Sequence, residues 1–186
     1  MSDHDPYSTP TSEIEVEPPS SLERQYFSTT PLKLVILSVC TLGLYEIYWF
    51  YKNWVLIKKR TGRSIMPFFR AFFAPIWAYS YFKYLSESAD DAGLLSGFSA
   101  GLLAVAYFSL YLASQLPDPF WLLSYFSAIC LLPANWLASE LNKLSTNDTE
   151  VQREFSILNW VAICIGGPFF VFMVVSVFRP EIWELI

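Results

Sequence analysis

The sequence predicts an all-α protein, a polytopic transmembrane helical bundle preceded by a disordered acidic N-terminal tail. Three observations lead to this class. Of the 186 residues, 54% are hydrophobic and 16% are charged, against about 45–50% and about 25% in soluble globular domains. Several long stretches carry no charge, and a helix needs about 20 apolar residues to cross the hydrocarbon core of a bilayer. The formal net charge of −5 lies entirely in the first 31 residues.

The acidic tail covers residues 1–31. It contains six acidic residues and one base, so the remaining 11 acidic and 11 basic residues leave the body, 32–186, neutral. Serine, threonine, proline and glutamate dominate the tail, and such a segment buries too little apolar surface to offset the entropy of ordering it. Nucleic acid is disfavoured as a partner, because no net positive field attracts phosphate.

Four uncharged or nearly uncharged segments are predicted to span the membrane: 32–51, 92–114, 119–138 and 156–178. The first contains Gly43 and Glu46, so a bent or re-entrant segment is an alternative to a straight helix there. Trp49 fits an interfacial anchor at its end. In the last segment, Gly166-Gly167-Pro168 predicts a break in the helix. Such a break is tolerated where neighbouring helices or water hydrogen-bond to the freed backbone groups.

A fifth apolar stretch, 66–85, is interrupted by Arg70, Pro75 and Lys83. A charge at the bilayer centre costs at least ~2.5 kcal/mol. We therefore expect this stretch to form a helix that lies in the cytoplasmic interface or is partly inserted, with its aromatic face in lipid. A fifth span is the alternative.

Basic residues concentrate between the first two apolar segments, and the positive-inside bias places this loop in the cytoplasm. Four spans then put both termini outside, although a re-entrant first segment would put the tail in the cytoplasm and satisfy the bias better. Four members of the cluster are also candidate contacts for anionic lipid headgroups, at about 1 kcal/mol each. They are Lys58, Lys59, Arg60 and Arg63.

Glu46 is the sharpest candidate site, because an ionisable group inside an apolar helix must have its desolvation compensated and is a functional candidate by default. Arg70 is its predicted partner in an intramembrane ion pair, and Lys83 is the second choice. The alternative is a purely structural pair, or a carboxylate that reaches water at the interface near Lys52.

Gly93, Gly97 and Gly101 recur every four residues within one predicted span. Small residues at this spacing let two helices approach closely, so they are predicted to form a helix-packing face, within the protein or between protomers. The same stretch matches G-x-S-x-G, but a hydrolase serine needs a histidine base, and the single histidine is His4 in the tail. Asn135 and Asn159 are predicted to hydrogen-bond across helices.

The stretch TLGLYEIYWFYKNW, residues 41–54, resembles a family of uncharacterised bacterial integral membrane proteins with a GLYxxYWFYKNW pattern after an apolar run. PFFRAFFAP, residues 67–75, is similar to the second element of that family. The resemblance covers about residues 27–178. It implies a multi-pass protein of the inner membrane, and it brings no activity with it.

No catalytic set, cofactor or metal site is predicted, since the three cysteines lack paired spacing. The sequence therefore favours a non-enzymatic scaffold or interaction partner in the cytoplasmic membrane, in contact with lipid and with a membrane-protein partner or a second copy. A small transporter or channel that uses Glu46 and Arg70 is the alternative. A membrane-embedded enzyme acting on lipid has only scattered serine and tyrosine residues to support it.

Overall fold

The computed structural model describes residues 24–146 and 155–179. Of the tail predicted to be disordered, 1–31, residues 1–23 lie outside the described residues. The prediction is wrong for its last part, because Tyr26 and Thr29 are buried, at 0% and 1% exposed. Within the described ranges the backbone is helical, as predicted. The elements are α1 (Pro31–Cys40), α2 (Leu44–Thr61), α3 (Pro67–Phe72), α4 (Ala74–Asp91), α5 (Ala100–Leu112), the 3-10 helices η1 (Ala113–Gln115) and η2 (Phe120–Phe126), α6 (Ser127–Thr146) and α7 (Ile157–Phe178).

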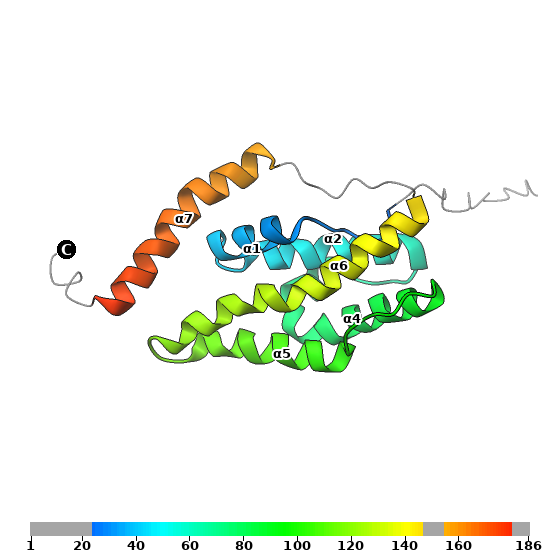
Figure 1. The fold of residues 1–186 in the computed structure, drawn as a ribbon, viewed down its shortest axis with the longest axis horizontal. Helices are drawn as coiled ribbons and strands as arrows, with labels where there is room; N and C mark the ends of the chain where they lie inside the picture. Colours follow the sequence, from blue (N-terminus) through cyan, green and yellow to red (C-terminus); the bar gives the residue numbers. More distant parts are fainter. Residues whose placement is uncertain (1–23, 147–154, 180–186) are drawn as a thin grey trace, which may run out of the picture.

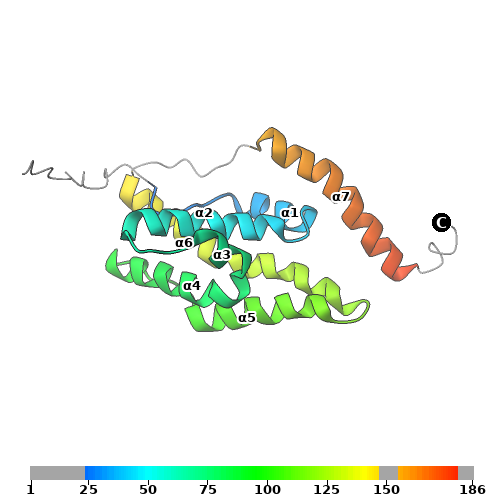
Figure 2. The same ribbon diagram turned by 180° about the vertical axis from the view of Figure 1, so that it is seen from behind.

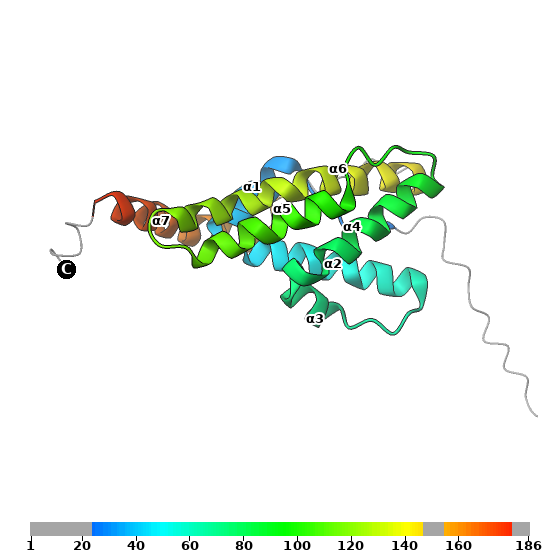
Figure 3. The same cartoon turned by 90° about the horizontal axis from the view of Figure 1, so that it is seen from below.

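The helices form an elongated bundle with one oblique outlier. Helix α6 packs against α1, α4 and α5, and α2 contacts α1, α3 and α4. Figure 1 shows α7 lying obliquely beside α1, at the end of the bundle opposite the C-terminal end of α6. The view from behind shows the same arrangement (Figure 2), and from below the short α3 protrudes beside α2 (Figure 3).

The predicted span 32–51 is a helical hairpin rather than one helix. Helix α1 ends at Cys40 and α2 begins at Leu44, after a turn in which Leu42 and Gly43 have φ values of 54° and 88°. The Gly43 N–H donates to the carbonyl of Ser38 at 2.8 Å, which closes the end of α1. The bent alternative therefore describes the backbone here, and the prediction of one straight helix is corrected.

The backbone conformation at position 43 requires glycine, whereas the space around its Cα does not. A Cβ at this position would meet nothing within 4 Å, but the φ of 88° is strained for any L side chain. We expect Gly43→Val to lower the free energy of unfolding by about 1–3 kcal/mol. Thermal unfolding in detergent measures this. Gly101→Ala, at a helical glycine without positive φ, is the control and should not destabilise; equal losses would contradict the assignment.

The predicted span 92–114 is helical only from Ala100 onwards. Gly93 and Gly97 lie in the loop after α4, with φ values of 71° and 70°. Only Gly101 is in a helix, so the predicted packing face of Gly93, Gly97 and Gly101 is wrong. The prediction failed because glycine is used in turns with positive φ as well as at close contacts between helices, and the spacing alone does not distinguish the two.

The predicted spans 119–138 and 156–178 fall on the two helices that are long and apolar enough to cross a membrane, Phe120–Ser145 and Ile157–Phe178. The predicted break at 166–168 is wrong, because α7 continues through it. Gly166 instead permits a close helix contact: a Cβ there would lie 1.7 Å from the carbonyl oxygen of Cys40. The stretch 66–85 forms two helices, α3 and α4, separated at Phe73.

Charge divides the bundle along its length. The C-terminal ends of α2, α4 and α6 meet at one end, where Arg60, Ser88 and Leu141 line a common cleft. Residues 34–51 and 100–139, which make up much of the other half, contain only two charged residues, Glu46 and Asp118. Aromatic side chains fill the middle, and Trp49, the predicted interfacial anchor, is fully buried there, with its ring centroid 5.2 Å from that of Tyr81.

Candidate functional site

Glu46 is held in the apolar half of the bundle by side chains from two other helices. The α1–α2 turn places it in the first turn of α2, where 5% of the residue is exposed. The Tyr107 hydroxyl, from α5, donates to Oε2 at 2.9 Å, and the Ser127 hydroxyl, at the start of α6, donates to Oε1 at 2.9 Å. Hydrogen bonds to both oxygens compensate part of the cost of burying the carboxyl group.

A cavity of about 340 Å³ opens beside this carboxyl group. Its lining combines four serines, four aromatic residues with a hydroxyl or indole group, and apolar residues, and contains no lysine, arginine or histidine. One of the four serines is Ser38, which is 2% exposed and whose hydroxyl has no hydrogen-bond partner within the described structure. We call this cavity the Glu46 pocket.

The structure does not bring Glu46 and Arg70 together. No ion pair between them occurs in residues 24–146; the Arg70 guanidinium carbon lies 4.6 Å from the Trp54 ring centroid and 4.3 Å from that of Trp77. Lys83, the second choice, pairs with Glu87 on its own helix at 3.7 Å. The predicted pair is thus corrected: cation–π contacts hold Arg70 at α3, while hydroxyl donors on α5 and α6 satisfy Glu46.

A second polar cluster, which we call the asparagine clamp, holds the extended segment 26–29 between α2 and α6. Its members are Asn53, Asn135 and Asn142. Asn142 accepts the Tyr26 N–H at 2.9 Å and donates to the Tyr26 carbonyl at 2.7 Å. Asn135 accepts the Thr29 N–H at 3.0 Å and donates to the Thr29 carbonyl at 2.6 Å. Each amide thus pairs with both backbone groups of one residue.

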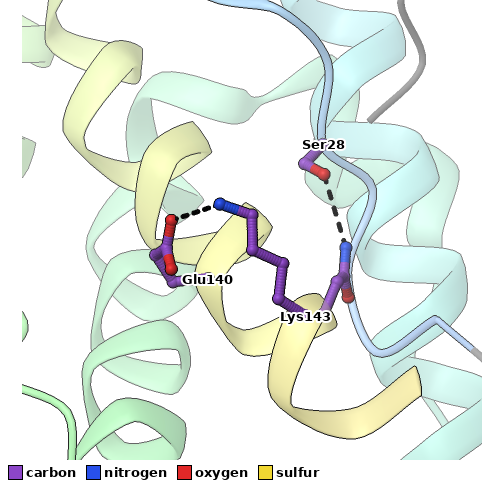
Figure 4. A network of polar contacts seen from close by, with 4 residues as sticks. Ser28, Glu140 and Lys143 are labelled. Atoms are coloured by element: carbon purple, nitrogen blue, oxygen red, sulfur yellow. Dashed lines mark hydrogen bonds and ion pairs between the residues drawn. The ribbon is translucent and has the colours of Figure 1, made fainter. Parts of the chain in front are cut away.

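Asn53 completes the clamp from α2. It accepts the Phe27 N–H at 3.0 Å and donates to the Phe27 carbonyl at 3.2 Å. Asn142 also donates to the Ser28 hydroxyl at 3.4 Å; Figure 4 shows Ser28 facing α6, while Lys143 points away to its ion pair with Glu140 at 2.7 Å. An extended segment without a sheet has its backbone groups satisfied by these side chains.

The basic cluster divides between internal and exposed positions. Arg60 donates to the Tyr26 hydroxyl at 2.7 Å and to Gln25 at 3.2 Å, and its guanidinium lies over the Tyr26 ring. Arg63 donates to the Tyr84 hydroxyl. Lys58 and Lys59 are exposed. Of the four predicted lipid contacts, Arg60 therefore has a structural role in holding the start of the described chain.

The remaining sequence motifs have local roles. Ser99, the serine of the G-x-S-x-G match, caps α5 by accepting the Leu102 N–H at 3.4 Å. Over the described ranges no group of three or more His, Cys, Asp or Glu side chains could hold a metal ion. Asn159 lies in the first turn of α7 and is half-buried.

Comparisons with models of known protein families, with curated proteins and with solved structures found no match. The class of protein defined here is therefore structural: an all-α bundle with two helices that could cross a membrane. The family resemblance of residues 41–54 stays a prediction, and function must be argued from the Glu46 pocket and the surface of the bundle.

Proposed function

We propose that this chain is a multi-pass integral membrane protein that binds a ligand or a partner and does not catalyse a reaction. The membrane assignment rests on exposed apolar surface. Helix α7 has no charged residue, and only 6% of its most apolar window is buried within the protein. Leu102, Val105 and Phe108 of α5 are exposed as well. Soluble monomers rarely expose apolar patches of this extent.

The charge distribution supports a particular topology. In it, α5 and the η2–α6 segment cross the membrane as an antiparallel pair, α7 crosses once, and the α1–α2 hairpin enters and returns on one side. The charged ends of α2, α4 and α6 then lie in the cytoplasm together with the tail, and Arg179 lies outside. This topology satisfies the positive-inside bias better than four spans with both termini outside. The exposed aromatic residues of α3, including Phe68 and Phe72, suit the interface.

Single-cysteine labelling tests this topology in a background where the three native cysteines are alanine. We expect an impermeant maleimide to label Asp118→Cys and Arg179→Cys in intact cells, because both positions face outwards. Ser12→Cys and Ser64→Cys should react only after the membrane is opened. Labelling of Ser12→Cys in intact cells would contradict the re-entrant hairpin and support four spans.

The binding role rests on one observation, the buried carboxyl group of Glu46 beside a cavity of about 340 Å³. This volume is at the lower end of the range of small-molecule sites, about 300–1,000 Å³. A buried acid without a basic partner is costly unless something else compensates it. The cavity is where a ligand can do so.

Purification from native membranes in mild detergent tests the binding role. We expect a small molecule, lipid or protein to accompany the wild-type chain and to be lost from Glu46→Gln. Glu87→Gln, which removes an exposed carboxylate of α4, is the control and should retain it. If the wild type purifies alone, or if all three samples carry the same molecules, the binding role at Glu46 is refuted.

A small transporter is the second candidate, and the same cavity favours it, because intramembrane acids commonly mark the paths of substrates and ions. The transporter hypothesis now rests on Glu46 without Arg70. Flux of the co-purified molecule into proteoliposomes would separate the two roles: a scaffold binds it without moving it.

A further inference from the structure

We propose that the Glu46 pocket binds a small organic cation, an ammonium group that pairs with the Glu46 carboxylate within a wall of aromatic rings. This inference rests on the proposed binding function and names its ligand class. Three features of the pocket support it: its charge, its aromatic wall and its free hydroxyl group.

The carboxylate of the pocket has no positively charged partner among the lining residues. Every residue of its lining other than Glu46 is neutral. The two hydrogen bonds that Glu46 accepts come from the neutral hydroxyls of Tyr107 and Ser127. A carboxylate has about four lone-pair positions, so each oxygen can still accept from a cation in the cavity. A positive ligand would complete the compensation that these two donors begin.

Aromatic residues from three elements form much of the wall. They are Phe72 of α3, Tyr107 and Tyr111 of α5, and Trp121 and Tyr125 of η2. The negative faces of such rings attract ammonium groups, and quaternary ammonium ligands are bound in aromatic cages. The Trp121 indole N–H donates to Asp118, which places a second carboxylate next to this wall.

The oxygen ligands of the pocket favour an organic cation over a metal ion. Glu46 is the single carboxylate in the lining, whereas Ca²⁺ takes 6–8 oxygen ligands that usually include several carboxylates. The Ser38 hydroxyl is buried in the lining without a hydrogen-bond partner there. It can accept an N–H or O–H group of a ligand.

The test compares choline with 3,3-dimethyl-1-butanol, which has the same shape without the charge. The full-length protein is purified in a maltoside detergent, whose headgroup has no nitrogen, and binding is measured by calorimetry and thermal shift. We expect saturable binding of choline that is at least about tenfold tighter than that of the alcohol. Glu46→Gln should weaken choline binding at least about tenfold and leave the alcohol unaffected, whereas the matched control Glu87→Gln should bind as the wild type does.

A second variant guards against misfolding of Glu46→Gln. Ser124→Trp fills the pocket and leaves Glu46 and its two donors in place, so it should abolish choline binding with an unchanged helical circular dichroism spectrum. Equal binding of choline and the alcohol by the wild type, or unchanged choline binding by folded Glu46→Gln, would each overturn the inference. A wild type that does not bind choline would overturn it too, unless that protein binds a choline lipid.

Ammonium groups occur in free amines and in lipid headgroups, and a further pair of probes distinguishes these sources. Dihexanoyl phosphatidylcholine is compared with dihexanoyl phosphatidylglycerol, which lacks nitrogen. Binding of the choline lipid but not of free choline, lost in Glu46→Gln, identifies a headgroup site; binding of neither refutes the ammonium class. Carbonate extraction scores the membrane assignment separately: release of the protein without detergent would refute the proposed function, whatever the ligand result.

Discussion

Asn135→Ala is expected to lower the free energy of unfolding by about 3–5 kcal/mol. The Asn135 amide satisfies the N–H and the carbonyl of Thr29, at 3.0 Å and 2.6 Å, and accepts the Trp49 indole N–H at 3.2 Å. Asn135 and Thr29 are each 1% exposed, and Trp49 is fully buried. Alanine would leave three buried polar groups without this partner, at about 1–3 kcal/mol for each unsatisfied group.

Unfolding in maltoside micelles with increasing sodium dodecyl sulfate measures this loss. The matched control is Asn159→Ala on α7, where the residue is half-buried and lies outside the clamp. A substitution of that kind usually changes stability by less than about 0.5 kcal/mol. Equal effects of the two substitutions would show that the clamp does not hold the segment 26–29.

Gly166→Leu is expected to separate α7 from the rest of the bundle. A Cβ at Gly166 would lie 1.7 Å from the oxygen and 2.7 Å from the carbon of the Cys40 carbonyl, and these backbone atoms cannot move aside as a side chain can. Overpacking a core usually costs about 1–3 kcal/mol, and a backbone clash leaves no rotamer to relieve it. The contact between α1 and α7 should therefore be lost while the other helices stay packed.

Disulfide formation reports on this contact directly. A Cβ at Gly167 would lie 3.9 Å from the Cys40 sulfur. With Cys130 and Cys164 replaced by alanine, Gly167→Cys should cross-link to Cys40 under mild oxidation, and adding Gly166→Leu should abolish the cross-link. Val171→Leu, which adds volume on the exposed side of α7, is the control and should leave the yield unchanged. A retained cross-link in Gly166→Leu would contradict the close approach.

Hydropathy predicted the bounds of the last helix almost to the residue, but it did not predict where the backbone turns between helices. The prediction 156–178 became α7, Ile157–Phe178. The helices within 32–51 and 92–114 have other bounds than predicted because an apolar run does not reveal φ, and Gly43 and the glycines after α4 take positive values. Gly93 follows shortly after the two aspartates that end α4. This position indicates the end of a helix, since glycine commonly follows the last helical residue.

The sequence predicted the acid of the candidate site but not the side chains that donate to it. Glu46 stood out as an acid in an apolar segment, but its donors Tyr107 and Ser127 lie 61 and 81 residues further along the chain and have no local signature. Arg70 was the wrong partner, because aromatic rings satisfy it without an acid. Of the asparagines, Asn135 was expected to bond between helices; the sequence gives no sign that amides would hold an extended segment.

The asparagine clamp also sets an order of events during synthesis. Thr29 and Asn135 are 106 residues apart, so at about 5–20 residues per second the ribosome needs about 5–20 s to supply the partner of a segment it has already made. Through that interval the α1–α2 hairpin exists without α6, so Asn53 can already pair with Phe27, whereas the backbone groups of Tyr26 and Thr29 lack their amide partners. Completion of α6 is thus the step that fixes the segment 26–29 against the bundle.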